Sequence, residues 1–204
     1  MPTPYGTGAI VTILRPPRPP LVDKALTQAR TWCAGHVIDD RPALVHAVRV
    51  AVTLGQHVPG APEHLVAAAL LHDAPELAST EVPLDRVLAA WFGVRVRDIV
   101  RALEVEHHAL DGPNPIIDTS DREVLLASTA DKIVAISSLL RRARASGDVD
   151  RFFAARPALL GLLGHFGAFA DAGVGIVPPS MTTALRDVLV LLDRATAHAR
   201  AAAS

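Results

Sequence analysis

The chain is poor in cysteine and in aromatic residues. Cys33 is the only cysteine, so an intrachain disulfide is excluded. A chain without disulfides suits a reducing compartment such as the cytosol. Aromatic residues make up only 4% of the sequence, whereas apolar residues make up 50%. The core is therefore expected to be aliphatic and built mainly from Ala, Leu and Val.

The sequence also lacks an excess of charge and a long apolar run. It has 20 Lys and Arg against 21 Asp and Glu, which argues against a general nucleic-acid binder. No segment approaches the roughly 18 to 20 apolar residues of a membrane span, and the N-terminus has no basic region of a secretory signal. These absences predict a cytoplasmic protein without a membrane or nucleic-acid partner. The oligomeric state stays open, and a homo-oligomer is compatible with the sequence.

Helical periodicity dominates the chain. RPPRPP at 15–20 cannot be helical, so residues 1–20 are expected to form a Pro-rich extension, with a short strand over 8–14, ahead of one domain at 21–204. Apolar spacing and stop signals predict helices at 21–34, 42–54, 62–76, 83–92, 94–110, 121–145, 149–170 with a break at Pro157, and 180–202. Ser120 and Glu123 fit a capping box for the sixth of these. No strand pattern recurs after residue 20. The expected fold is all-α, a single helical bundle of about seven to nine helices.

One apolar helix ends in reactive side chains. The stretch at 65–76 reads LVAAALLHDAPE and ends in His72, Asp73 and Glu76. Pro75 removes a backbone donor and its ring clashes with the preceding turn, so the helix must end or kink beside the HD pair. If the helix persists, Glu76 shares the face of that pair. It would then position or deprotonate an attacking water.

Four side chains form a candidate metal-binding set. His46, His72, Asp73 and Asp131 follow one another in the order H…HD…D, and three separate predicted helices carry them. A mixed imidazole and carboxylate set suits Mn²⁺, Fe²⁺, Zn²⁺ or Ni²⁺ better than Ca²⁺. A bound ion would lower the pKa of a water and offset charge on a phosphoryl group.

Three segments resemble a known family. AAALLHDAPE, FGVRVRDIVRALE at 92–104 and STADKIVAISSLL at 128–140 are similar to segments of the HD-domain phosphohydrolases, and most closely to the hydrolase domain of RelA/SpoT-type enzymes and small alarmone hydrolases. The resemblance covers about residues 21–145. It implies that His46, His72, Asp73 and Asp131 bind a divalent ion. Mn²⁺ is expected, with Fe²⁺, Ni²⁺, Zn²⁺ or Mg²⁺ as alternatives. It also implies that Glu76 acts on the attacking water and that a nucleotide 3′-diphosphate such as (p)ppGpp, or a nucleotide phosphate, is hydrolysed.

Two alternatives remain open. HDAPELASTEVP at 72–83 also resembles a motif of HD-type 5′-nucleotidases, which implies a second catalytic acid at Glu81 and (deoxy)nucleoside monophosphates as substrates. Leu77 and Ala135 stand where alarmone hydrolases usually carry an acid and an asparagine. These two departures motivate the other alternative, a non-catalytic nucleotide-binding regulator.

Basic residues near the motifs are candidates for binding the phosphates of the substrate: Lys132, Arg41, Arg49 and Arg122. Arg141, Arg142 and Arg144 follow on the Asp131 helix, where a solvated face competes with contacts to the far end of a long nucleotide. The triplet at 106–108, Glu-His-His, is interpreted as a polar surface patch, because adjacent helical residues point about 100° apart.

Overall fold

The described part of the chain is almost entirely helical. The computed structural model describes residues 13–112 and 115–203. They form ten α-helices and a sheet of two very short strands, which confirms the all-α class. The helices are α1 Pro20–Trp32, α2 Ala43–His57, α3 Glu63–Leu71, α4 Ala74–Leu77, α5 Leu84–Phe92, α6 Val94–Ala109, α7 Arg122–Ala145, α8 Val149–Ala154, α9 Pro157–Ala172 and α10 Pro179–Ala203; the strands are β1 Val37–Ile38 and β2 Arg41–Pro42.

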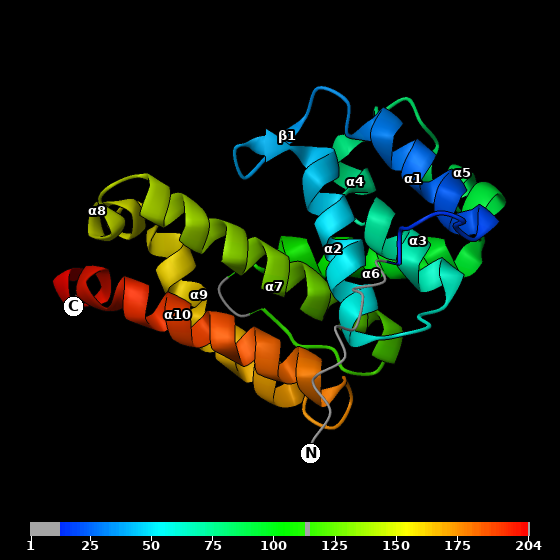
Figure 1. Cartoon of the computed structure of the whole chain (residues 1–204). Helices are drawn as coiled ribbons and strands as arrows, with labels where there is room; N and C mark the ends of the chain where they lie inside the picture. The colour runs from blue at the N-terminus through cyan, green and yellow to red at the C-terminus, as the bar shows by residue number, and fades with distance from the viewer. Residues whose placement is uncertain (1–12, 113–114, 204) are drawn as a thin grey trace, which may run out of the picture.

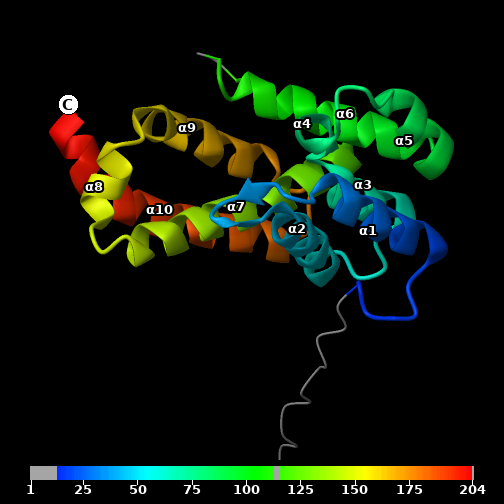
Figure 2. The same ribbon diagram turned by 90° about the horizontal axis from the view of Figure 1, so that it is seen from above.

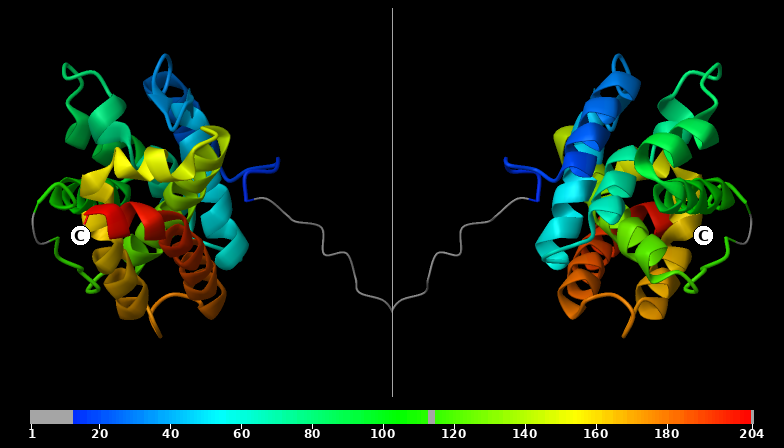
Figure 3. Two further views of the ribbon diagram at one scale, coloured as in Figure 1. Left: turned by 90° about the vertical axis from the view of Figure 1, so that its left-hand side faces the viewer. Right: turned by 90° about the vertical axis from the view of Figure 1, so that its right-hand side faces the viewer.

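The long helix α7 connects two groups of helices (Figure 1). Helices α1 to α6 gather at one end of the molecule, where α3 packs against α1, α2 and α6. Helices α8, α9 and α10 form the other end, and α10 also packs along α7 (Figures 1 and 2). Views from the two ends show the C-terminus of α10 beside α8 and α9 (Figure 3). The metal-binding candidates lie on helices of the first group and on α7.

The core is aliphatic, as expected. Among the largest fully buried side chains, Phe153 is the one aromatic, and the others are Leu, Ile or Met. In α3, every residue from Leu65 to Leu71 is buried. A helix that is apolar all round must be enclosed by other elements, and each fully buried Leu stabilises the fold by about 1.5–3 kcal/mol. Helix α3 is thus a rigid central support, and His72 follows its last residue.

The predicted helix at 62–76 is divided. Helix α3 ends at Leu71, His72 is its C-cap and Asp73 is the N-cap of the one-turn helix α4. The break confirms the effect expected of Pro75, which cannot donate a backbone hydrogen bond. The predicted helix at 149–170 is likewise two helices, α8 and α9, with Pro157 opening the second. These divisions raise the count from the expected seven to nine helices to ten in the described residues.

The strands are a feature that the sequence analysis missed. Val37 pairs with Pro42 and Ile38 with Arg41 in an antiparallel hairpin. Asp39 and Asp40 form its two-residue loop, with φ values of 55° and 61°. Short polar residues tolerate this left-handed conformation, which tight hairpins require. The guanidinium of Arg142 donates to both carboxylates, at 2.8 Å and 2.7 Å, and so ties the hairpin to α7.

Two further expectations concern the start of α7 and the N-terminus. Asp121 rather than Ser120 caps α7, because its carboxylate accepts from the backbone amides of Glu123 and Val124 and is held by Arg95. Most of the expected extension, with residues 8–12 of its strand, lies outside the described residues. Ile13 and Leu14 form a turn and pack against the core. No helix in the described ranges is long and apolar enough to cross a membrane.

Candidate metal centre

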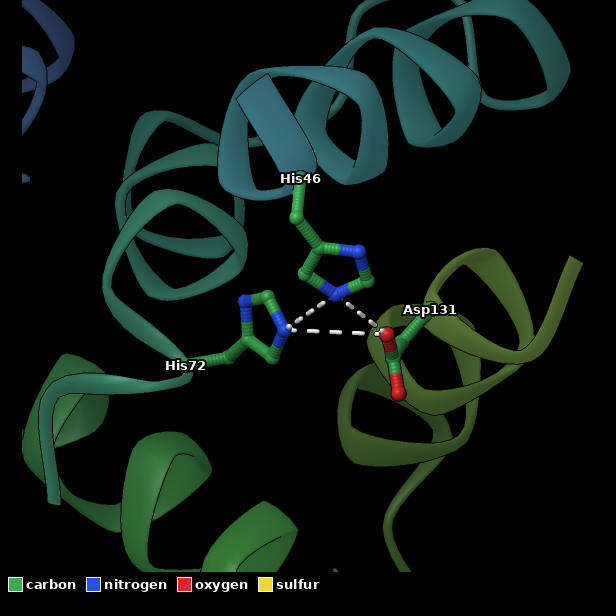
Figure 4. Close-up of side chains that lie close together, drawn as sticks. All are labelled: His46, His72 and Asp131. Carbon is green, nitrogen blue, oxygen red and sulfur yellow. Dashed lines mark hydrogen bonds and ion pairs between the residues drawn. The ribbon is translucent and has the colours of Figure 1, made fainter. Parts of the chain in front are cut away.

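Three helices bring His46, His72 and Asp131 to one point (Figure 4). His46 comes from α2, His72 from the end of α3 and Asp131 from α7. His46 Nε2 lies 3.0 Å from Asp131 Oδ1 and 3.2 Å from His72 Nε2, and His72 Nε2 lies 3.6 Å from Asp131 Oδ1. All three residues are buried, and one ligand atom from each lies within 4.8 Å of the others. This group can hold a divalent metal ion.

Backbone geometry fixes the tautomer of His72. Its Nδ1 lies 2.9 Å from the carbonyl oxygen of Ala69. A carbonyl oxygen can only accept, so Nδ1 carries the proton and donates it. When the ring is neutral, its lone pair is therefore on Nε2, the atom that faces His46 and Asp131. This is the tautomer that a metal ligand needs.

Asp73 brings a second carboxylate to the same point. Its Oδ1 lies 3.2 Å from His72 Nε2, and its Oδ2 lies 3.9 Å from His46 Nε2. Among the described residues, the buried Oδ2 atom has no hydrogen-bond partner. Burying a carboxylate oxygen without a partner is costly, and a cation in the centre would remove that cost. The structure therefore brings all four predicted ligands together.

The electrostatics of the centre also favour a cation. Burial alone would lower the pKa of His72, but the Asp73 and Asp131 carboxylates raise it to about 10. Burial would raise the pKa of Asp131, but hydrogen bonds from His107, His46 and His72 hold it well below its usual range. A negative potential that binds a proton this firmly also attracts a divalent ion. Two imidazole nitrogens with two carboxylates fit a transition metal or Mn²⁺ better than an all-oxygen ion such as Ca²⁺.

The two predicted catalytic acids lie on the surface. Glu76 is an exposed residue of α4, and Glu81 is exposed between α4 and α5, where its backbone amide donates to Ser79 Oγ at 3.3 Å. Within the described ranges, neither is hydrogen bonded or ion-paired to the four ligands. Their catalytic roles stay predictions.

Lys132 and Arg122 make contacts elsewhere in the protein. Lys132 is buried and ion-paired with Glu106, and its Nζ lies 3.0 Å from Ser128 Oγ. Arg122 is exposed and donates to the carbonyl of Ile176 at 3.0 Å. Substrate binding by either residue stays a prediction, and for Lys132 it would require the pair with Glu106 to open.

Arg41 and Arg49 belong to a basic cluster on the hairpin, α2 and α7. Arg49 follows His46 by one turn and donates to Ser138 Oγ at 2.8 Å. Burial and the charges of Arg141 and Arg41 lower the pKa of Arg49, and the charge of Asp39 opposes them. Ser138 lies seven residues beyond Asp131, or about 10 Å along α7 at about 1.5 Å per residue. We call Arg41, Arg49 and Arg141 the arginine cluster.

The interpretation of residues 106–108 as a surface patch was wrong for two of the three. His107 Nε2 lies 3.2 Å from Asp131 Oδ2, and Glu106 contacts Ser128 and Lys132. Only His108 is exposed. Because α6 packs against both α3 and α7, two successive side chains of α6 reach α7 at different levels. Helical periodicity could have predicted that His107 faces the core, since His107 follows the buried Leu103 by four residues and lies on the same helical face.

A separate cavity of about 710 Å³ lies between α6, α7 and Phe169. Its lining is mostly apolar and includes Glu106 and Ser128, but none of the four metal-ligand candidates. It is therefore distinct from the centre.

Comparisons with known proteins add no family to this description. No protein-family model matches the chain, and no curated protein matches it. The functional assignment therefore depends on the geometry of the centre and on the motifs that supply its ligands.

Proposed function

We propose that this protein is a metal-dependent nucleotide phosphohydrolase of the HD superfamily, with an alarmone such as (p)ppGpp as the leading substrate. One observation supports the proposal: His46, His72 and Asp131, far apart in sequence, converge on one buried point from α2, α3 and α7, and Asp73 Oδ1 lies 3.2 Å from His72 Nε2. The three sequence segments that resemble alarmone hydrolases support the same assignment.

The four candidate ligands and Glu76 have different roles in this function. His46, His72, Asp73 and Asp131 hold the ion, for which Mn²⁺ is the first candidate. An ion held there would lower the pKa of a bound water and offset charge on the phosphoryl group. The hydrogen bond from His72 Nδ1 to Ala69 keeps the Nε2 lone pair directed into the centre. Glu76, on the first turn after the HD pair, accepts the proton of the attacking water.

The arginine cluster supports a substrate with more than one phosphate group. The charges of Arg41 and Arg141 lower the pKa of Arg49 and the Asp39 carboxylate raises it, and a bound anion would add to the effect of Asp39. Arg49 of the cluster donates to Ser138, which lies about 10 Å from Asp131 along α7, and this placement suits a nucleotide with phosphates at two positions. This feature favours an alarmone over a nucleoside monophosphate.

The proposal is tested with metal-stripped protein supplied with Mn²⁺ and offered guanosine 3′-diphosphates or (deoxy)nucleoside monophosphates, with products separated by chromatography. Release of pyrophosphate from the 3′ position is the expected result. Phosphate release from monophosphates alone would instead support the 5′-nucleotidase. Nucleotide binding without turnover would support the non-catalytic regulator.

A matched pair of variants makes the test specific. Asp73→Ala removes a ligand and should abolish turnover, whereas Asp187→Ala removes an exposed carboxylate of α10 and should leave it unchanged. Turnover that survives Asp73→Ala, or that needs no metal, would contradict the proposed mechanism.

A further inference from the structure

The two oxygens of Asp131 have different partners. Oδ1 faces the centre, 3.0 Å from His46 Nε2 and 3.6 Å from His72 Nε2. Oδ2 faces the other way and lies 3.2 Å from His107 Nε2. Helix α6 thus contributes a side chain to the centre in addition to those of α2, α3 and α7.

The direction of the His107 contact follows from the chemistry of its partner. An Asp carboxylate is ionised at neutral pH and can only accept. His107 Nε2 therefore carries a hydrogen and donates it to Oδ2. Among the described residues, the side chains that place ligand atoms within 4.8 Å of one another are His46, His72 and Asp131, and His107 is outside this group. The His107 ring lies edge-on to the His72 ring, and the two ring centroids are 6.1 Å apart.

We propose that His107 is a positioning residue that sets the affinity of the centre for its divalent ion. The terminal torsion of an Asp side chain has a broad minimum. The bond to Oδ2 holds the carboxylate so that Oδ1 stays directed at His46 and His72. This inference rests on the metal centre of the proposed function, and it adds a residue that the H…HD…D pattern does not contain.

The expected size of the effect follows from the behaviour of residues that orient metal ligands. Removing such a partner typically weakens metal binding about 10- to 100-fold. His107→Leu should do so here, because Oδ2 then has no donor and the carboxylate can turn. His107→Gln should restore most of the affinity, because its amide presents an N–H at a similar reach.

The experiment is a calorimetric titration of metal-stripped protein with Mn²⁺, together with the thermal unfolding of each metal-free variant. His108→Leu is the matched control, since His108 is the exposed neighbour of His107 on α6. We expect one ion per chain in every variant, a dissociation constant raised about 10- to 100-fold in His107→Leu, recovery in His107→Gln, and no change in His108→Leu.

Failure of the inference is distinguishable from failure of the proposed function. Wild-type protein that binds no Mn²⁺ would contradict the metal centre itself. If wild type binds and His107→Leu binds equally well, the positioning role is overturned, and a lower unfolding temperature would then identify a structural tie between α6 and α7. Equal losses in His107→Leu and His107→Gln would overturn the role of the donated hydrogen bond.

Discussion

Two groups of buried charge lie along the contact between α6 and α7, and they are balanced differently. One consists of Lys132, Glu106 and Ser128: a cation faces an anion, and the hydroxyl contacts both. The other is the candidate metal centre, where the carboxylates of Asp73 and Asp131 meet two imidazoles at their Nε2 atoms. The first group is complete within the protein, whereas the second leaves Asp73 Oδ2 without a hydrogen-bond partner among the described residues.

The difference predicts that the first group stabilises the fold and that the second binds a cation. A buried ion pair whose hydrogen bonds are all made requires no ligand, so its loss is expected to lower the stability of the fold. A buried group in which one carboxylate oxygen has no hydrogen-bond partner favours a bound cation, so loss of this group is expected to weaken metal binding. Both groups include side chains of α6 and α7, so variants in one serve as controls for the other.

The largest effect should come from Asp131→Asn. This change removes one negative charge from the centre and keeps the size of the side chain. The loss of Mn²⁺ affinity should exceed the ~10- to 100-fold typical of a residue that only orients a ligand. Calorimetric titration measures it, with Asp187→Asn as the exposed control. Retained affinity would show that the centre is not the metal site.

Glu106→Gln should lower the stability of the protein and leave its Mn²⁺ affinity unchanged. It leaves the Lys132 ammonium buried without its counter-charge, and breaking a buried pair typically costs about 3–5 kcal/mol. Urea denaturation of metal-free protein should show that loss of stability, while the Mn²⁺ affinity stays at the wild-type value. A double variant, Glu106→Gln with Lys132→Met, should recover part of the stability because no buried charge is left. A large loss of metal affinity in Glu106→Gln would show that the two groups are coupled.

Mn²⁺ binding should strengthen as the pH rises. In the metal-free protein, Asp73 and Asp131 raise the pKa of His72 to about 10, so Nε2 is protonated at neutral pH. A bound ion needs that nitrogen as a lone pair, and binding must release the proton. Affinity should therefore rise up to about tenfold per pH unit between pH 6 and 8. Titrations in buffers of different ionisation enthalpy count the protons released. An affinity that is flat over this range would mean that His72 gives up no proton on binding.

The smallest effect should come from Ser128→Ala. The Lys132–Glu106 pair stays, and only the hydroxyl that contacts both is lost. A hydrogen bond to a charged group contributes about 1.5–3 kcal/mol at most, so stability should fall by less than in Glu106→Gln. Metal affinity should not change. A Ser128→Ala loss as large as that of Glu106→Gln would mean that the hydroxyl, not the pairing of charges, dominates this group.

Sequence reasoning predicted which residues lie together in the candidate metal centre, because most of them have a strong local signal. His72 and Asp73 follow an uninterrupted apolar helix, Pro75 marks its end, and Asp131 lies in a recognisable motif of α7. It missed His107 because that residue becomes part of the centre only when α6 packs against α7. His107 follows the buried Leu103 by four residues, so helical periodicity would have placed it on the buried face of α6.

Tertiary contacts also explain other features that local sequence patterns do not show. Lys132 was expected at a phosphate because it follows Asp131 in sequence; its side chain pairs with Glu106 on another helix, and the phosphate-binding role stays a prediction. The hairpin at 37–42 has too few residues for a strand pattern, and it depends on the left-handed Asp39 and Asp40 and on Arg142 of α7. Local patterns thus predicted which helices form, and packing decided which polar side chains meet.

The most direct test of the metal centre is a crystal structure of the protein soaked with Mn²⁺, with the ion located by its anomalous scattering. We predict one strong peak per chain, at bonding distance from His46 Nε2, His72 Nε2 and carboxylate oxygens of Asp73 and Asp131. A peak at another site, or no peak under conditions in which calorimetry shows binding, would contradict the assignment of this buried group as the metal centre.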